Sequence, residues 1–249
     1  MRGNREEEIG IIYEDDHLLV VNKPSGLLTM SAGRQGEETV YRIVTDYVRN
    51  GRSQRGRGPH RRGGDRIFIV HRLDRDTSGI LLFAKNEEIK FALQDNWNEI
   101  VLERKYIALV EGVPRQAEGT VTSWLHDNPA TMTVHSSPYD DGGKKATTHY
   151  KVIREIKSGT VSDKGQTRHH FAPGYALVEF ELETGRKNQI RVHSAEMGHP
   201  VAGDRKYGAR TSPIGRLALH AMTISFRHPA TGKVMRFSTG IPNAFKRIR

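Results

Sequence analysis

The chain has 249 residues, a formal net charge of +10 and no cysteine. A chain of this length buries about 70 to 75 per cent of the surface that it exposes when unfolded, so its core needs no cross-link, and the lack of cysteine excludes disulfides and thiolate metal sites. The polar start at Met1–Glu8 and the shortness of every apolar run exclude an export signal and a membrane span, which predicts a soluble cytoplasmic protein.

Strands and helices alternate along the chain in an α+β pattern without internal repeats. Ile9–Tyr13 and Leu18–Asn22 are predicted to form a hairpin around the polar residues 14–17. Residues 23–26 (Lys-Pro-Ser-Gly) end this hairpin with turn chemistry. Apolar residues then recur at helical spacing over Glu37–Val48, which predicts the first helix.

The second part of the chain carries most of the expected strands. Asn86 is predicted to cap a helix, because Glu87 and Glu88 follow it and Ile89, Leu93, Trp97 and Ile100 form one apolar stripe. A polar hairpin loop is expected over residues 157–170, and a helix over Asn188–Met197 that Gly198 stops. The remaining predicted strands are Ile67–Val70, Ile80–Ala84, Tyr106–Val110, Thr120–Trp124, Met132–His135, Thr147–Ile153 and Tyr175–Glu183.

A polar stretch at residues 71–79 (His-Arg-Leu-Asp-Arg-Asp-Thr-Ser-Gly) lies between two of these short strands. Strand ends present side chains from a rigid scaffold, so Asp74 is the candidate for chemistry. Residues 77–79 can supply hydroxyls and a close backbone approach to a ligand. The alternative is a structural turn, in which Asp74 or Asp76 only accepts hydrogen bonds from backbone amides two residues on.

The stretch resembles the signature of the RluA-type family of RNA pseudouridine synthases, in which His-Arg-Leu-Asp is followed two residues later by Thr-Ser-Gly. Five further blocks, one upstream and four downstream of this stretch, stand in that family's order, and the resemblance runs from about Ile9 to about Pro242. At the position of Asn188 the family more often carries His. The blocks are VVNKPSGL at residues 20–27, RKY at 104–106, TGRKNQIRVH at 184–193, GDRKYG at 203–208 and LHA at 219–221.

This resemblance implies a fold and a set of site residues. The expected fold is the α+β pseudouridine synthase catalytic fold, a largely antiparallel mixed sheet with flanking helices and loops, as one catalytic domain over residues 1–249. Asp74 is implied as the nucleophile on a flipped-out uridine, and Arg72 as the side chain that fills the gap left by the base. Tyr106 is implied to stack on the uracil. Arg191 is implied to pair with Asp74 and to keep the carboxylate ionised.

The implied reaction also sets expectations for other components. Uracil leaves C1′ of its ribose, turns and rejoins through C5, so the isomerisation demands no cofactor and no metal. The expected partner is RNA, with no obligatory protein partner and a monomeric chain. The family often carries an N-terminal S4-type RNA-binding module, and because the first motif begins near Ile9, the sequence predicts a chain without one.

A basic segment at residues 49–66 contains seven Arg and a single Asp, with five Gly and one Pro. It has too few apolar residues to fold by itself, which predicts a flexible Arg/Gly-rich insertion. It is either a solvated insertion or an arm whose Arg side chains bind RNA phosphates. The candidate RNA-binding residues are Arg49, Arg52, Arg55, Arg57, Arg61, Arg62, Arg66 and, in a later motif, Arg186.

Several alternatives stay open at this point. The RNA is ribosomal or transfer RNA, and Asp74 either attacks C1′ covalently or assists the departure of uracil to a glycal. A hydrolase that uses Asp74 and Asp76 as a carboxylate pair would instead release free uracil. A non-catalytic RNA-binding protein would form no product, and a change of Asp74 could then alter only its affinity for RNA.

Overall fold

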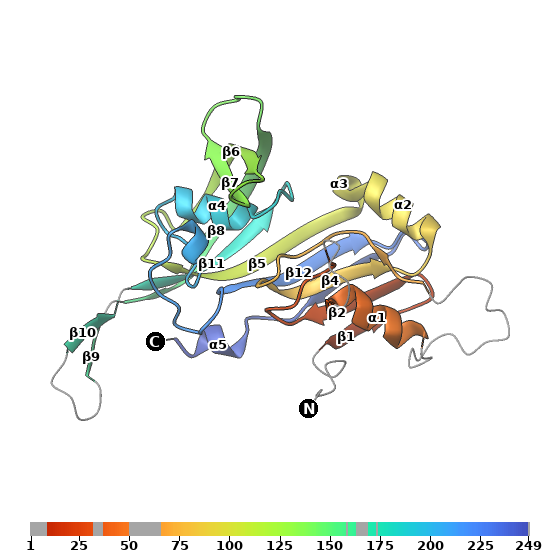
Figure 1. The fold of residues 1–249 in the computed structure, drawn as a ribbon, viewed down its shortest axis with the longest axis horizontal. Coiled ribbons are helices and arrows are strands. Elements are labelled where there is room, and N and C mark those ends of the chain that lie inside the picture. The colour runs from red at the N-terminus through yellow and green to blue at the C-terminus, as the bar shows by residue number, and fades with distance from the viewer. Residues whose placement is uncertain are drawn as a thin grey trace. The chain divides into compact units, whose positions relative to one another are not determined.

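The computed structural model describes residues 9–31, 37–49, 66–157, 159–162, 169–172 and 174–248 (Figure 1). The chain divides into two units, Met1–Arg104 with Ala221–Gly240 and Lys105–His220 with Ile241–Arg249. That both units act as one catalytic domain stays a prediction. Most of the predicted Arg-rich insertion, residues 50–65, lies outside the described residues together with Arg52, Arg55, Arg57, Arg61 and Arg62.

The first unit contains strands in the order β1-β2-β4-β12. The predicted hairpin is confirmed, since β1 and β2 pair antiparallel and the Asp15 carboxylate accepts the N–H groups of His17 at 2.8 Å and Leu18 at 2.7 Å in the connecting turn. β2 also pairs antiparallel with β4, every residue of which is buried. The strands are β1 (Gly10–Glu14), β2 (Leu18–Lys23), β4 (Ser78–Ala84) and β12 (Leu219–Arg227), with β3 (Phe68–Ile69) on β4 and β13 (Val234–Ser238) on β12.

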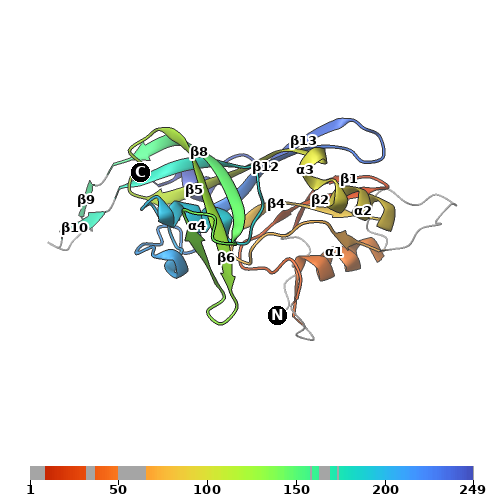
Figure 2. The ribbon, with the colours of Figure 1, turned by 90° about the horizontal axis from the view of Figure 1, so that it is seen from above.

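The described part of this unit contains the helices α1 (Val40–Arg49), α2 (Glu87–Asp95) and α3 (Trp97–Ile100). α1 begins three residues later than predicted. The predicted cap is confirmed, because Asn86 Oδ1 accepts the N–H of Ile89 at 2.8 Å. The single helix expected after Asn86 is wrong, since Asn96 ends α2 with φ −116° and ψ 26°. α2 lies beside β4 (Figure 2). Its buried residues Ile89 and Leu93 belong to the same apolar cluster as Ile80 and Leu82 of β4.

The second unit has an antiparallel sheet in the order β5-β11-β8-β6-β7. Its strands lie where the sequence predicts them, but β5, β6 and β8 extend into polar residues, because ladder hydrogen bonds use the backbone and not the side chains. The bounds are β5 (Val101–Glu111), β6 (Glu118–Asn128), β7 (Thr133–Ser137), β8 (Lys144–Ile156) and β11 (Tyr175–Leu182).

Shorter elements complete this unit. The loop predicted at residues 157–170 connects the antiparallel strands β8 and β11, but it contains strand residues, since β9 (Gly159–Ser162) and β10 (His169–Ala172) pair antiparallel. The helices are α4 (Gln189–Glu196), the 3-10 helix η2 (Arg205–Tyr207) and α5 (Asn243–Lys246). The α+β class and the largely antiparallel sheet are confirmed. Among the described residues, no helix has the length and the apolar composition needed to cross a membrane. The cytoplasmic location stays a prediction.

Candidate active site

The turn that carries Asp74, residues 73–76, is held in place by the side chain of Lys23, which is completely buried at the end of β2. Its Nζ donates to three backbone carbonyls, those of Pro24 at 2.9 Å, Leu27 at 2.6 Å and Arg75 at 2.8 Å. A buried ammonium group requires such acceptors, because it has lost its water. The contact with Arg75 therefore ties the residue after Asp74 to the end of β2.

The segment after Lys23 adds further bonds around the same turn. Thr29 Oγ1 donates to the carbonyl of Leu73 at 2.9 Å and accepts its N–H at 3.2 Å. Ser25 Oγ donates to the carbonyl of Asp76 at 2.7 Å, and the N–H of Gly26 donates to the carbonyl of Arg75 at 2.9 Å. Residues 73, 75 and 76 are each fixed, so the backbone that carries Asp74 is preorganised. The Asp74 side chain itself is half-buried.

The sequence identified residues 23–26 as a turn and as part of a family motif, but it did not predict the contacts that Thr29 and Lys23 make with the turn around Asp74. The available signal was a lysine two residues after the apolar run of β2, since a charged side chain at the end of a buried strand needs partners. Residues 77–79 were predicted to supply hydroxyls and a close backbone approach to a ligand, and the structure shows them in contact with the protein instead. Thr77 and Ser78 are buried, and the close approach that Gly79 permits is to the backbone of Ala221 on β12.

His71 begins the stretch and is neutral. Its Nε2 accepts the N–H of Leu82 at 2.9 Å, and its ring lies 4.9 Å from that of Trp97. Burial, together with the nearby charge of Arg104, lowers the pKa of His71 from 6.5 to about 3. Because Nε2 is an acceptor at all ordinary pH values, His71 serves as a fixed anchor between the turn and β4.

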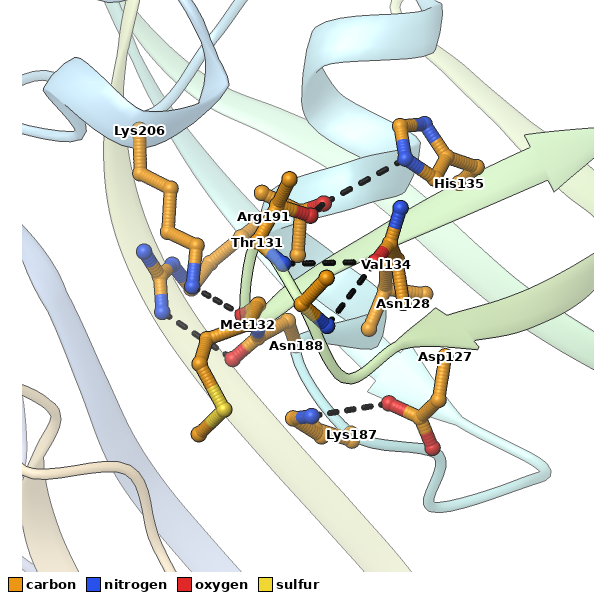
Figure 3. A network of polar contacts seen from close by, with 12 residues as sticks. Asp127, Asn128, Thr131, Met132, Val134, His135, Lys187, Asn188, Arg191 and Lys206 are labelled. Carbon is orange, nitrogen blue, oxygen red and sulfur yellow. Dashed lines mark hydrogen bonds and ion pairs between the residues drawn. The ribbon is translucent and has the colours of Figure 1, made fainter.

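Arg191 lies on α4 in the second unit, and its guanidinium group makes contacts that sequence analysis did not predict. Nε and one terminal nitrogen donate to the two carboxylate oxygens of Asp204 at 2.6 and 2.8 Å. The other terminal nitrogen donates to Asn188 Oδ1 at 3.0 Å (Figure 3), and the group lies 4.9 Å from the ring centre of Tyr207. The predicted pairing of Arg191 with Asp74 stays a prediction.

The start of α4 differs slightly from the prediction. Asn188 has left-handed backbone angles (φ 55°, ψ 17°), and the helix begins at Gln189. Buried Gln189 anchors this start, because its amide donates to the carbonyl of Thr147 and accepts the N–H of Arg186 at 2.9 Å. The predicted stop at Gly198 is confirmed by its positive φ of 79°.

The other predicted site residues occupy different surroundings. Arg72 is exposed in the first unit, and Tyr106 is half-buried on β5 of the second unit, opposite Phe180 of β11. Arg49 and Arg186 are exposed. Arg66 is also exposed and forms an ion pair of 3.5 Å with Glu87. Over the described part of the chain, no three His, Cys, Asp or Glu side chains gather where they would hold a metal ion.

The free energy of unfolding depends on pH through His193, which lies on α4. Nε2 contacts Ser123 Oγ at 3.1 Å, Nδ1 contacts Thr148 Oγ1 at 2.8 Å, and burial lowers the pKa of His193 from 6.5 to about 4. The unfolded chain therefore binds a proton between these values that the folded chain rejects, so stability falls as the pH decreases from 6.5 to 4. At pH 5 this histidine costs about 2 kcal/mol relative to pH 7.5.

The measurement is urea unfolding of wild type and His193→Gln at both pH values. We expect the loss of unfolding free energy between pH 7.5 and 5 to be smaller in His193→Gln by about 2 kcal/mol. The matched control is His135→Gln, at an exposed histidine of the same unit, which should keep the wild-type pH dependence. Equal pH dependence in all three proteins would contradict a neutral, buried His193.

Comparison with known proteins agrees with the predicted family. Residues 17–196 match the family model described as RNA pseudouridylate synthase. The RNA pseudouridine synthase YhcT of Bacillus subtilis is 34% identical over 243 residues, 97% of this chain and 71% of that protein. The ribosomal large subunit pseudouridine synthase C of Salmonella typhimurium is 35% identical over 246 residues, 95% of this chain and 68% of that protein.

The fold is also found in a solved structure. The structure of human RNA pseudouridylate synthase domain containing 1 superimposes with a TM-score of 0.69 at 22% sequence identity, over 97% of this chain and 87% of that chain. The turn around Asp74 and the start of α4 both lie within the matched residues 17–196. The chain belongs to the RluA-type family of RNA pseudouridine synthases, which are isomerases.

Proposed function

We propose that the chain converts uridine to pseudouridine in ribosomal or transfer RNA and that Asp74 is its catalytic nucleophile. The observation that carries the proposal is the clamped turn, in which Lys23, Thr29 and Ser25 fix the backbone on both sides of the half-buried Asp74. A carboxylate held in this way is oriented before the substrate arrives, which is what covalent attack on a sugar carbon requires. Relatives named as ribosomal large subunit synthases favour ribosomal RNA as the target.

In the proposed reaction the target nucleotide first leaves its stack, at a cost of a few kcal/mol. In the covalent route, a bond forms between C1′ and a carboxylate oxygen of Asp74 as the bond between C1′ and N1 breaks, and in the glycal route Asp74 takes the proton of C2′ as that bond breaks. The uracil turns and C5 bonds to C1′, while the bond to Asp74 breaks or the proton returns to C2′. C5 then loses its proton, and N1 regains one. Substrate and product are isomers, so the balance needs no oxidant and no co-reactant.

Three further side chains support this chemistry in the proposal. Arg72, exposed beside Asp74, fills the space of the extruded base with its flat guanidinium group. The half-buried Tyr106 stacks on the uracil, because an aromatic face binds a base strongly without opposing its in-plane rotation. Arg191 stabilises the ionised form of Asp74 by its positive charge and its planar pair of donors.

The direct test supplies the protein with ribosomal and transfer RNA that carry tritium at C5 of uridine. We expect tritium release without free uracil. Free uracil would favour the hydrolase, and binding without either product would favour the non-catalytic RNA-binding protein. Mapping pseudouridine in total RNA from cells that lack the protein, before and after its return, then identifies the modified uridine.

The Arg-rich segment leads to a separate prediction about RNA affinity. Residues 50–65 contain five of the seven Arg of the segment. If they bind phosphates, replacing the segment by an equally long Gly-Ser sequence should weaken RNA binding and reduce the slope of log K against log salt concentration by about 3 to 4. Filter binding between low and moderate salt measures both quantities.

The matched control replaces the same five Arg by Lys, which keeps the charge. This variant should retain most of the salt dependence, since counterion release depends on charge and not on the guanidinium group. An unchanged slope in the Gly-Ser variant would identify the segment as a solvated insertion without an RNA contact.

A further inference from the structure

Arg191 is held by three side chains of its own unit, Asn188, Asp204 and Tyr207, which we call the Arg191 cradle. Asp204 binds two nitrogens of the guanidinium group, Asn188 binds the third, and the ring of Tyr207 lies over its face. All three nitrogens and one face of the group are thereby engaged. A planar group with contacts on its edges and on its face has little freedom to rotate.

The fold makes this arrangement rigid. The side chain of Asp204 is only 1% exposed, and its backbone carbonyl accepts the N–H groups of Tyr207 and Ala209, both at 3.0 Å. A buried ion pair of this kind contributes little net stability, because desolvation of the two charges offsets most of their attraction. The geometry that the pair imposes on Arg191 is therefore its main consequence.

The hydroxyl group of Tyr207 also connects the cradle to the β6–β7 hairpin. Tyr207 OH accepts the amide N–H of Asn188 at 2.9 Å and the backbone N–H of Val134 on β7 at 3.0 Å. The neighbouring Lys206 donates from Nζ to the carbonyl of Met132 in the same hairpin (Figure 3). Removing the hydroxyl of Tyr207 would leave its ring on Arg191 but would remove its hydrogen bonds to Asn188 and to Val134 of the hairpin.

We propose that Asn188, Asp204 and Tyr207 are positioning residues that set the orientation of Arg191, and that Tyr207 makes this orientation depend on the β6–β7 hairpin. The inference rests on the proposed function of Arg191 toward Asp74. Catalysis is sensitive to displacements of about 1 Å in a charged donor, so small losses of order in Arg191 lower the rate of the chemical step while RNA binding stays the same.

The activity test is a double-mutant cycle with Tyr207→Phe and Arg191→Lys, measured as single-turnover rates with saturating enzyme. Tyr207→Phe should lower the rate about 10-fold, with the Kd for RNA within about twofold of wild type. In the Arg191→Lys background, the same change should alter the rate by less than about twofold, because the planar group that Tyr207 orients is gone. Equal losses in both backgrounds would overturn the proposal, since a merely structural role is additive.

A second measurement is independent of activity. In the NMR spectrum of the full chain, the Nε–H signal of Arg191 should exchange slowly with water in wild type, because Asp204 accepts it. Asp204→Asn should accelerate this exchange at least about 10-fold. The control Asp127→Asn breaks the exposed ion pair with Lys187 in the same region and should leave the signal unchanged. Fast exchange of this signal in the wild-type protein would refute the proposal that the cradle holds Arg191 in one orientation.

These two readouts separate the possible failures. If Asp74→Asn retains turnover or Arg191→Lys retains the wild-type rate, the proposed function is wrong, and the NMR exchange still decides whether the cradle orders Arg191. If both of those variants lose activity but Tyr207→Phe keeps the wild-type rate, the proposed function stands and the positioning role of Tyr207 is refuted.

Discussion

Asp74→Asn is expected to lower the rate of pseudouridine formation by about 10⁴-fold or more, while the affinity for RNA stays within about twofold of wild type. The amide has the shape of the carboxylate but carries no charge and is a poor nucleophile, so it keeps the contacts of the ground state and loses the bond-forming step. Tritium release from C5 of uridine measures the rate, and filter binding measures the affinity.

Asp76→Asn is the matched control, because Asp76 lies two residues further along the same turn and is exposed. We expect it to retain activity within about threefold of wild type, since a surface carboxylate outside the chemistry contributes little. If both variants were inactive and the wild type released uracil, the two carboxylates would act as the pair of a hydrolase. Unaltered turnover in Asp74→Asn would end the assignment of Asp74 as nucleophile.

Gly79→Ala should destabilise the first unit by about 3 kcal/mol or more. Gly79 has φ +117°, a conformation that residues with a side chain rarely adopt, and a Cβ atom there would lie 2.2 Å from the carbonyl oxygen of Ala221. The obstructing atoms belong to the backbone of β12, so relief requires that β4 and β12 separate. Thermal unfolding, followed by circular dichroism, measures the loss.

Gly26→Ala separates the cost of backbone strain from the cost of the clash. Gly26 also has a positive φ, of 87°, but a Cβ atom added there would meet open space, with no atom beyond its chain neighbours within 4 Å. We expect this control to lose only about 1 kcal/mol, the usual cost of a left-handed residue with a side chain. Similar losses in the two variants would show that the approach of β4 to β12 is looser than the structure has it.

The elements that sequence analysis predicted well are those specified by neighbouring residues. The hairpin of β1 and β2, the cap at Asn86 and the stop at Gly198 each depend on residues within four positions, where side-chain oxygens and glycine angles act directly on the backbone. The break at Asn96 was missed, because the apolar stripe continues across it into α3.

The strands β12 and β13 and the helix α5 were not predicted as elements. Signals of both strands were present, since apolar and polar residues alternate over Met222–Arg227 and Pro229 and Gly232 follow as a turn. Eight of the nine residues of β12 are buried or partly buried, so its Ser and Thr lie inside the protein as well. The alternation predicts a strand with one solvent-facing side, and only the structure shows that both sides are covered.

The family, the α+β class and the turn that carries Asp74 can be predicted from the amino-acid sequence, because they depend on short motifs and on local periodicity. The groups that hold this turn and those that hold Arg191 become known only from the folded chain. Lys23 reaches Arg75 across 52 positions of sequence, and Tyr207 reaches Val134 across 73. A buried polar group bonds to the backbone groups that the fold brings near it, and these lie far away in the sequence. The pattern of neighbouring residues therefore does not predict which partners it finds.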